Sequence, residues 1–324
     1  MRQNPLLSIV ITSYTMERLN NSFKLLDSIK TQTYPEIETI FVAEGSQELL
    51  EKVKVYSEEK AIPNTTIMFK QGEKSASTAR NMGIKQAKGD IIAFVDDDAL
   101  LSIDWADEMV KTYHDEAIIG VAGAVTPLWE DESMNWLPEE FFWLISCTAF
   151  TGWDKLRDTR NAWTTNSSYR REVFDSVEFF RTDTGPGQGN QWRGFAEDEE
   201  LTFRVKEKTG RRVVFNPKVK VCHNVYKRRI TLKSIANNAY WIGLTRTELK
   251  KRYPKNDTSE NALEEERQLI IRIFTRLLPD ILKNVFTHPV NAWRKFSATV
   301  VVLFCSAIGY VSGLLKEVFK RSPK

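Results

Sequence analysis

Short apolar runs alternate with helical patterns along the first 125 residues of the chain. The apolar runs have the length and β-branched content of buried strands, and they cover residues 7–13, 37–43, 65–70, 90–96 and 118–125. Segments with apolar residues three or four positions apart lie between them, at residues 19–29, 47–60, 77–88 and 104–114. This rhythm predicts an α/β fold with a mostly parallel sheet and helices on both of its faces.

Composition supports a globular protein and adds a clue about location. Of the 324 residues, 42% are apolar and 27% are charged, which is ordinary for a globular chain. The three cysteines are odd in number and form no CxxC pair, so they are expected to be reduced, intracellular thiols. The first residues predict a strand and show no signal-peptide cleavage pattern.

Charge is distributed unevenly along the chain. Residues 1–200 contain 20 basic and 34 acidic residues, whereas residues 201–324 contain 26 basic and 9 acidic ones. A basic C-terminal third is compatible with nucleic acid, an anionic membrane surface or phosphate binding. A nucleic-acid-binding protein would not explain the acidic cluster and the apolar tail described below, so no nucleic-acid partner is expected.

Three adjacent carboxylates follow the apolar run at residues 90–96. In a mostly parallel sheet, the carboxyl end of a strand is where ligands bind. Asp96 and Asp98 share one side if the backbone stays extended, and Asp97 then points away. Two carboxylates with phosphate oxygens and water suit Mg²⁺ or Mn²⁺. The alternative is a solvated acidic turn.

Two further segments carry candidate polar groups. Glu197 and Asp198 lie at the start of a predicted helix, where carboxylates also favour the helix N-terminus without any catalytic role. Residues 211–223 predict a pair of strands with a turn around Asn216 and Pro217, and they end at His223, either a metal ligand or a core histidine. A glycine-rich loop is expected at residues 182–194.

Five blocks of sequence, taken together, resemble the family 2 glycosyltransferases. They are SIVITSYTMERL (8–19), FVAEGS (41–46), TARNMGIKQAKGDIIAFVDDDA (78–99), AWTTNSSYRREVFDSV (162–177) and GFAEDEELTFRVKEKTGRRVVFNPKVKVCH (194–223). The resemblance implies the GT-A fold, a Rossmann-like mixed sheet with helices on both faces. It also implies transfer of a sugar from a nucleotide-sugar donor, expected to be UDP-linked.

The resemblance assigns donor-binding roles to five residues. Thr12 and Tyr14 would meet the nucleotide base, and Glu44 would accept a hydrogen bond from uracil, although the family usually has aspartates there. Arg80 would pair with phosphate or position Asp96, and Asp96 would hold the ribose and the metal-bound phosphate. For Arg80, a surface cation on a helix is the alternative.

The resemblance also implies a metal and an inverting mechanism. Asp98 would be the direct ligand of Mg²⁺ or Mn²⁺, assisted by Asp96 and by His223. Asp198 would act as the catalytic base, and Glu197 would position the acceptor. A phosphate acceptor would need no strong base.

The C-terminal tail predicts contact with a membrane. Residues 261–286 form an amphipathic pattern. Its apolar face contains Ile270, Ile273, Phe274, Leu277, Leu278 and Ile281. Residues 296–315 contain no charge and are long enough to span a bilayer as a helix, or to lie in its interface. The expected location is the cell membrane, with the catalytic domain on the cytoplasmic side.

These features predict a three-part organisation and a substrate class. Residues 1–125 would bind the nucleotide sugar, residues 126–250 would form the acceptor side, and residues 251–324 would form the membrane helices. Within the family, the segment at 219–253 is most similar to archaeal enzymes that extend a dolichyl-phosphate-linked glycan, such as glucosyl-dolichyl phosphate glucuronosyltransferases. The expected acceptor is therefore a lipid-linked saccharide.

Other functions fit parts of the pattern. Exopolysaccharide or O-antigen assembly, or synthesis of a polyisoprenyl-phosphate sugar, would use the same donor site. A nucleotidyltransferase would need a glycine-rich phosphate loop after the first strand, and residues 11–19 contain no glycine. A non-catalytic scaffold would require that the carboxylates bind no metal.

Overall fold

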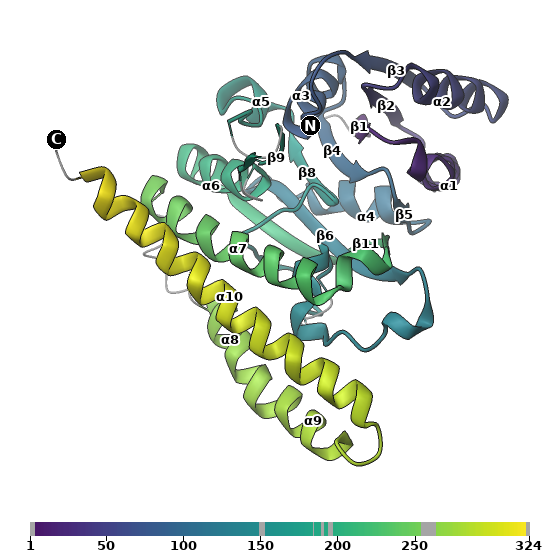
Figure 1. Ribbon diagram of the computed structural model, residues 1–324. Helices are drawn as coiled ribbons and strands as arrows, with labels where there is room; N and C mark the ends of the chain where they lie inside the picture. Colours follow the sequence, from purple (N-terminus) through teal and green to yellow (C-terminus); the bar gives the residue numbers. More distant parts are fainter. Residues whose placement is uncertain are drawn as a thin grey trace. The chain divides into compact units, whose positions relative to one another are not determined.

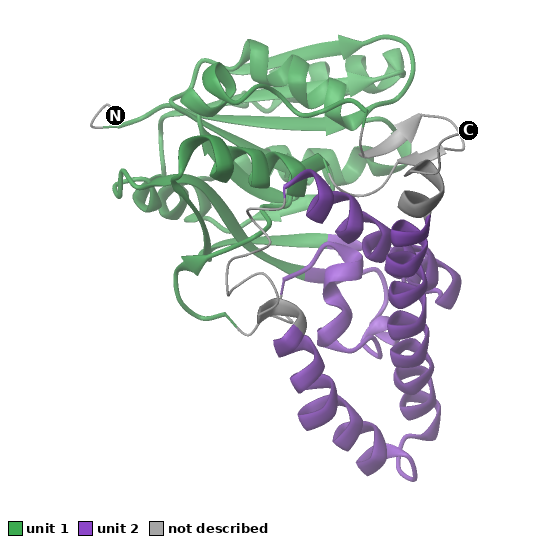
Figure 2. Ribbon diagram, turned by 90° about the vertical axis from the view of Figure 1, so that its left-hand side faces the viewer, with its two compact units in different colours: residues 1–126, 153–223 green, residues 127–152, 224–324 purple. Residues whose placement is uncertain are grey.

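The computed structural model describes residues 4–148, 153–183, 185–188, 191–193, 197–253 and 264–321. Within these ranges, the side chains of residues 185–193, 264–266 and 316–321 lie outside the description. The chain forms two compact units. The first contains residues 1–126 and 153–223, and the second contains residues 127–152 and 224–324 (Figure 2).

The first unit is built on a mixed sheet with the strand order β3-β2-β1-β4-β8-β6-β11-β5, and β7 pairs with β11 (Figure 1). Strands β1 to β4 run parallel, and β8 runs antiparallel to both β4 and β6. The strands are β1 (Leu7–Ser13), β2 (Ile37–Glu44), β3 (Thr65–Lys70), β4 (Ile91–Asp96), β5 (Ala99–Leu101), β6 (Ile118–Trp129), β7 (Arg157–Asp158), β8 (Asn166–Arg170) and β11 (Arg212–Val225). The α/β fold predicted from the apolar runs is confirmed.

Helices follow the strands of the first unit as the periodicity predicts. They are α1 (Leu19–Lys30), preceded by the short η1 (Met16–Arg18), α2 (Gln47–Glu59), α3 (Ala76–Gln86), α4 (Trp105–Thr112), α5 (Glu172–Ser176) and α6 (Glu197–Thr209). Serine side chains begin two of them. Ser46 accepts a hydrogen bond from the backbone N–H of Leu49, and Ser75 accepts one from that of Thr78. These caps satisfy helix N–H groups that have no partner inside the helix.

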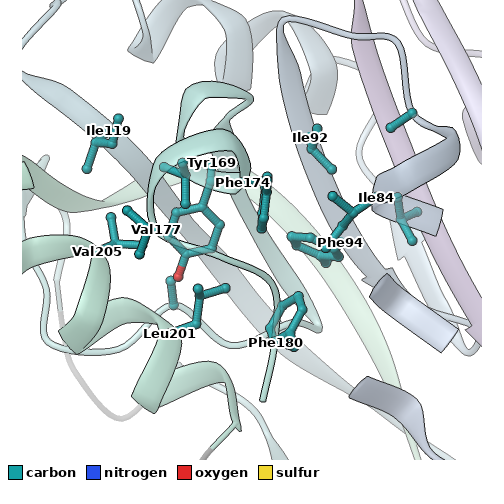
Figure 3. Close-up of a cluster of buried hydrophobic side chains, with 14 of the residues drawn as sticks. Ile84, Ile92, Phe94, Ile119, Tyr169, Phe174, Val177, Phe180, Leu201 and Val205 are labelled. Carbon is teal, nitrogen blue, oxygen red and sulfur yellow. The ribbon is translucent and has the colours of Figure 1, made fainter. Parts of the chain in front are cut away.

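One buried cluster joins the sheet to helices α3, α5 and α6 (Figure 3). Phe94 of β4 belongs to this cluster, with its ring 5.0 Å from that of Phe180 and edge-to-face with it. The Tyr169 hydroxyl, although buried in this apolar cluster, pairs with Thr202 Oγ1 at 2.8 Å. Because β4 is buried among these side chains, the acidic residues that follow it are held in a fixed place.

The predicted strand pair at residues 211–223 is wrong. Residues 212–225 form one continuous strand, β11, without a turn at Asn216 and Pro217. Strand β11 lies next to β6 in the sheet, and two further ladders hold it: Val214 and Phe215 pair with β7, and residues 221–223 pair with β5. Pro217 lies between these two pairings, so neither ladder needs the N–H group that proline lacks.

The predicted glycine-rich loop at residues 182–194 contains a small antiparallel sheet. Strands β9 (Gly185–Gln188) and β10 (Gln191–Arg193) pair with each other. Their side chains, together with residues 184, 189–190 and 194–196, lie outside the described part of the structure.

The second unit is mostly helical. Its elements are the short helices η2 (Glu132–Met134), η3 (Glu139–Ile145) and η5 (Lys227–Ile230), then α7 (Leu232–Arg252), α8 (Glu264–Arg272), the π-helical turn η6 (Ile273–Leu277), α9 (Leu278–Asn284) and α10 (Pro289–Arg321). Among the described residues, one helix segment, at residues 289–315, is long and apolar enough to cross a membrane. It is longer than the predicted helix at residues 296–315.

The single apolar face predicted for residues 261–286 is wrong in part. Ile273, Leu277 and Ile281 are buried, but Ile270 and Phe274 are exposed. The π-helical turn η6 separates α8 from α9 and advances the chain by more residues per turn than an α-helix does. The apolar side chains therefore divide between an inner face and an outer face.

Candidate active site

The carboxyl ends of three neighbouring strands meet at one edge of the first unit's sheet. In the parallel register, Thr12 of β1 lies beside Asp96 of β4, and Ser13 lies beside Ala43 of β2. Glu44 therefore ends the neighbouring strand on the same edge. The sheet order places the three candidate segments together, as expected for ligand binding in an α/β fold.

Asp96, Asp98 and His223 form a cluster at this edge. Each offers one ligand atom, and these atoms all lie within 4.8 Å of one another. The antiparallel pairing of β5 and β11 sets His223 opposite Ala99, directly after Asp98. His223 Nε2 lies 3.1 Å from Asp98 Oδ1, and both side chains are buried.

The donor set of this cluster fits a divalent cation. Two carboxylates and an imidazole combine the hard oxygen donors that Mg²⁺ and Mn²⁺ prefer with one nitrogen ligand. Burial of the Asp98 carboxylate is costly unless positive charge compensates it. Asp96, Asp98 and His223 could hold such an ion, and their role as ligands stays a prediction.

Asp97 does not join the cluster. It accepts a hydrogen bond from Ser13 Oγ at 2.5 Å and pairs with Arg18 at 3.0 Å. Arg18 also lies 3.3 Å from Asp98. Burial, with the nearby Asp98 carboxylate, raises the pKa of Asp97 to about 6. Asp97 thus helps to hold the turn that presents Asp98.

The sequence pattern did not single out Arg18 as a site residue. Burial lowers the pKa of Arg18, but Asp98 and Asp97 outweigh that effect and raise it above its usual value. Arg18 lies in the first block that resembles the family, SIVITSYTMERL, where its position after the strand was the only signal. Its partners are 79 residues away in sequence, so periodicity could not reveal the pairing.

Arg80 connects the aspartates to the start of α6. One guanidinium nitrogen lies 3.0 Å from Glu197 Oε1, and another lies 3.9 Å from Asp96 Oδ1. Asp96 also accepts a hydrogen bond from Thr165 Oγ1 at 2.6 Å, a partner that the sequence pattern did not single out. Arg80 is 8% exposed, so the surface-cation alternative is wrong.

Asp198 lies in the first turn of α6, next to the Arg80 ion pair. It is half-buried, and its Oδ1 accepts a hydrogen bond from the backbone N–H of Glu199 at 2.8 Å. Burial and the neighbouring Glu197 carboxylate raise the pKa of Asp198 well above its usual value. A carboxylate with a raised pKa is a stronger base than an ordinary aspartate, which suits proton abstraction.

Glu44 has partners of its own at the end of β2. Its Oε2 lies 3.2 Å from Lys70 Nζ and accepts a hydrogen bond from the backbone N–H of Ser75 at 2.8 Å. Both charged side chains are buried. Tyr14, in contrast, is 44% exposed, and Lys74 Nζ lies 4.9 Å from its ring centre. Tyr14 thus has an exposed ring with cations beside it, whereas Glu44 is buried and already engaged.

The buried Glu44–Lys70 pair makes a stability prediction. Replacing Lys70 with Met leaves the Glu44 carboxylate buried without its counter-ion, which should cost about 3 kcal/mol of unfolding free energy. Urea unfolding of Lys70→Met measures this loss. Lys52→Met is the matched control, because Lys52 is exposed and its ion pair with Glu48 should contribute under about 0.5 kcal/mol. Equal stability of the two variants would contradict a structural role for Lys70.

Comparison with known proteins agrees with this geometry. The pattern of the family described as "Glycosyl transferase family 2" matches residues 8–178. A "Glucosyl-dolichyl phosphate glucuronosyltransferase" from Haloferax volcanii is 28% identical over 310 residues, covering 95% of this chain and 96% of that protein. "Glycosyltransferase AglE" from the same organism is 31% identical over 124 residues, covering 37% of this chain and 40% of that protein.

A solved structure shares the fold. It is described as "Mannosyltransferase PcManGT from Pyrobaculum calidifontis in complex with GDP-Man and Mn2+", with a TM-score of 0.64 and 18% identity over 96% of this chain and 88% of that one. The sheet, the site at its edge and these matches define a GT-A glycosyltransferase fold. The chain belongs to glycosyltransferase family 2, and it is a glycosyltransferase.

Proposed function

We propose that this protein is an inverting, metal-dependent glycosyltransferase that moves a sugar from a UDP-linked donor to a lipid-linked saccharide. One observation carries the proposal: Arg80 joins Asp96 of the Asp–Asp–His cluster to Glu197, the residue before Asp198. The groups that would bind the leaving diphosphate and the group that would activate the acceptor are thereby held in one connected network.

The cluster at the end of β4 is proposed to stabilise the leaving group of the reaction. Breaking the bond from the sugar to the diphosphate leaves negative charge on phosphate, and a bound Mg²⁺ or Mn²⁺ stabilises such charge. Asp98, Asp96 and His223 would hold the ion. Arg18 keeps the Asp97–Asp98 turn in place, and Thr165 fixes Asp96 Oδ2.

Residues at the start of α6 are proposed to activate the acceptor. A hydroxyl that attacks the anomeric carbon from the face opposite the diphosphate must lose its proton, and Asp198 is the carboxylate proposed to take it. The Arg80–Glu197 ion pair fixes the first residue of the helix. Glu197 is therefore proposed as a positioning residue for Asp198 and for the acceptor.

Donor recognition is proposed to depend on the end of β1. The exposed ring of Tyr14 offers a face on which a nucleotide base can stack, and Thr12 lies beside Asp96. Lys70 and Ser75 both contact Oε2 of Glu44, so Glu44 would contact the base through its other carboxylate oxygen. The related mannosyltransferase structure contains GDP-Man, which makes GDP the comparison to test.

Nucleotide-dependent stabilisation tests the donor proposal. In the presence of Mn²⁺, we expect UDP to raise the melting temperature more than GDP does, and EDTA to remove most of either shift. A ligand at about 100 times its Kd stabilises the folded state by about 2.7 kcal/mol, which is measurable by thermal unfolding. A larger shift with GDP would indicate a GDP-linked donor in place of a UDP-linked one. Equal shifts with and without EDTA would contradict the metal role.

The acceptor is proposed from the full-length relative and the apolar tail. That relative is described as a glucosyl-dolichyl phosphate glucuronosyltransferase, and the match covers nearly all of both chains. An acceptor of this class, a saccharide on a polyisoprenyl phosphate, remains in the membrane. The apolar helix α10 suits a protein that works there, with its catalytic unit proposed on the cytoplasmic side of the cell membrane.

A further inference from the structure

Helices α7 and α10 pack with their backbones in contact. A Cβ atom added at Gly243 of α7 would lie 2.1 Å from the Ser306 carbonyl oxygen, and one added at Gly313 of α10 would lie 1.8 Å from Thr247 Oγ1. The contacts advance in the same direction along both helices, so the two run parallel (Figure 1). Glycine permits this close approach, because a larger residue would clash. Helix α7 therefore packs tightly against residues 306–313 of α10.

The two faces of α10 are the reverse of those of a helix in a water-soluble protein. Its buried positions are mostly small residues: Ala292, Ala298, Thr299, Gly309 and Gly313. Its exposed positions include many large apolar ones, among them Trp293, Phe296, Val300, Phe304, Ile308 and Val311. A continuous apolar surface of this length is rare on a soluble monomer and indicates contact with an apolar partner.

The charges on α7 argue against α10 crossing a bilayer. Arg246 lies on the part of α7 that runs beside residues 306–313 of α10, and Glu248 and Lys250 follow within the next turn. If that part of α10 crossed the hydrocarbon layer, α7 would be drawn in with it. Each such charge costs about 2.5–3.5 kcal/mol at the bilayer centre. The described residues offer no second apolar helix that would shield them there.

The other end of α10 is also tied to polar groups on one side. Lys295 pairs with Asp280 of α9 at 2.6 Å. On α8 and η6, Arg272 and Arg276 lie 3.7 and 3.4 Å from Glu139 Oε2 of η3. Ion pairs therefore anchor α8, η6 and the start of α10 within the second unit.

The π-helical turn η6, helix α9 and the turn that follows it present a further exposed apolar surface. Phe274 is 65% exposed, Leu282 is 72% exposed and Phe286 is 92% exposed. Two exposed cations, Lys283 and Arg294, flank this surface near the connection between α9 and α10. Large apolar side chains bordered by basic ones are the composition of a helix that lies in a membrane interface.

We propose that α10 lies in the plane of a single leaflet and does not cross the membrane. Its large apolar side chains enter the acyl layer, and α7 stays on the water side. The occupant of the exposed face is the lipid leaflet, with anionic headgroups favoured because each basic residue near such a surface contributes about 1 kcal/mol. The inference concerns topology alone and does not depend on the transfer reaction.

Protease protection of the full chain tests the topology. The wild-type protein carries one epitope tag before Met1 and another after Lys324, and sealed membrane vesicles are prepared from the expressing cells in one orientation. A helix in one leaflet leaves both tags on the same face, so protease should remove both tags or neither, depending on the orientation of the vesicles. Detergent should then make both accessible in every preparation.

Two results would overturn the proposal. Removal of one tag while the other stays protected until detergent is added would show that the chain crosses the bilayer. Recovery of the protein as a water-soluble dimer that does not float with vesicles would show that a second copy covers the apolar face. Neither result involves catalysis, so neither would test the proposed function.

A pair of variants tests the orientation of α10 within the leaflet. Phe304→Arg places a charge on the exposed apolar face and should lower the fraction bound to vesicles of phosphatidylglycerol and phosphatidylcholine at least tenfold. Asn291→Arg adds the same charge at an exposed polar position of the same helix, and it should leave binding at the wild-type level or raise it. Far-ultraviolet circular dichroism checks that both variants fold. Equal binding of the two folded variants would contradict insertion of this face.

Discussion

Asp98→Asn is expected to lower kcat/KM by about 10³-fold or more while the protein remains folded. The substitution keeps the size of the side chain but removes a charge from the Asp96–Asp98–His223 cluster. A metal ion supplies several kcal/mol of charge stabilisation at a departing phosphate, and 10³-fold corresponds to about 4 kcal/mol. Binding of Mn²⁺, followed by electron paramagnetic resonance, should weaken in parallel.

Asp104→Asn is the matched control for this variant. Asp104 is an exposed aspartate six residues further along the chain, and its side chain does not cap α4. The control should retain both turnover and Mn²⁺ binding. Wild-type Mn²⁺ affinity in Asp98→Asn would contradict its assignment as a ligand, whatever the effect on turnover.

Asp198→Asn is expected to lower kcat by about 10²-fold or more with little change in the KM of the donor. Loss of a general base typically has an effect of this size, and the donor is proposed to bind through other residues. Because burial and Glu197 raise the pKa of Asp198, wild-type kcat/KM should fall on acidification at a pH above that of an ordinary aspartate. The residual activity of the variant should lack this acid limb.

Glu207→Gln provides the comparison on the same helix. Glu207 is exposed near the end of α6, far in sequence from its first turn, so its loss should leave kcat and the pH profile unchanged. An unaltered kcat in Asp198→Asn would reject Asp198 as the base and favour a phosphate acceptor or another carboxylate.

The parallel half of the sheet could be predicted because its signals are local. Apolar runs of six or seven residues became β1 to β4, and the helices between them start within one residue of where the periodicity begins. The position of Asp96 and Asp98 at a strand end follows from the same runs. His223 could be suggested only by resemblance, since its approach to Asp98 depends on the pairing of β11 with β5.

What escaped prediction depends on distant contacts or on small changes of helical phase. Pro217 indicated a turn, but it lies between two ladders of one strand. Arg18 was not singled out, because its aspartate partners come much later in the chain. The π-helical turn η6 changed which apolar residues face inward, and no feature of the sequence marked it.

Metal-dependent transfer of a sugar to a lipid-linked acceptor is the central claim. The most direct measurement follows radiolabelled sugar from UDP-sugar donors into material extracted by organic solvent from membranes that contain the full chain. The account predicts transfer that stops with EDTA, returns on addition of excess Mn²⁺ or Mg²⁺, and yields a product with inverted anomeric configuration. Undiminished transfer in excess EDTA, or a product that retains the configuration of the donor, would contradict it.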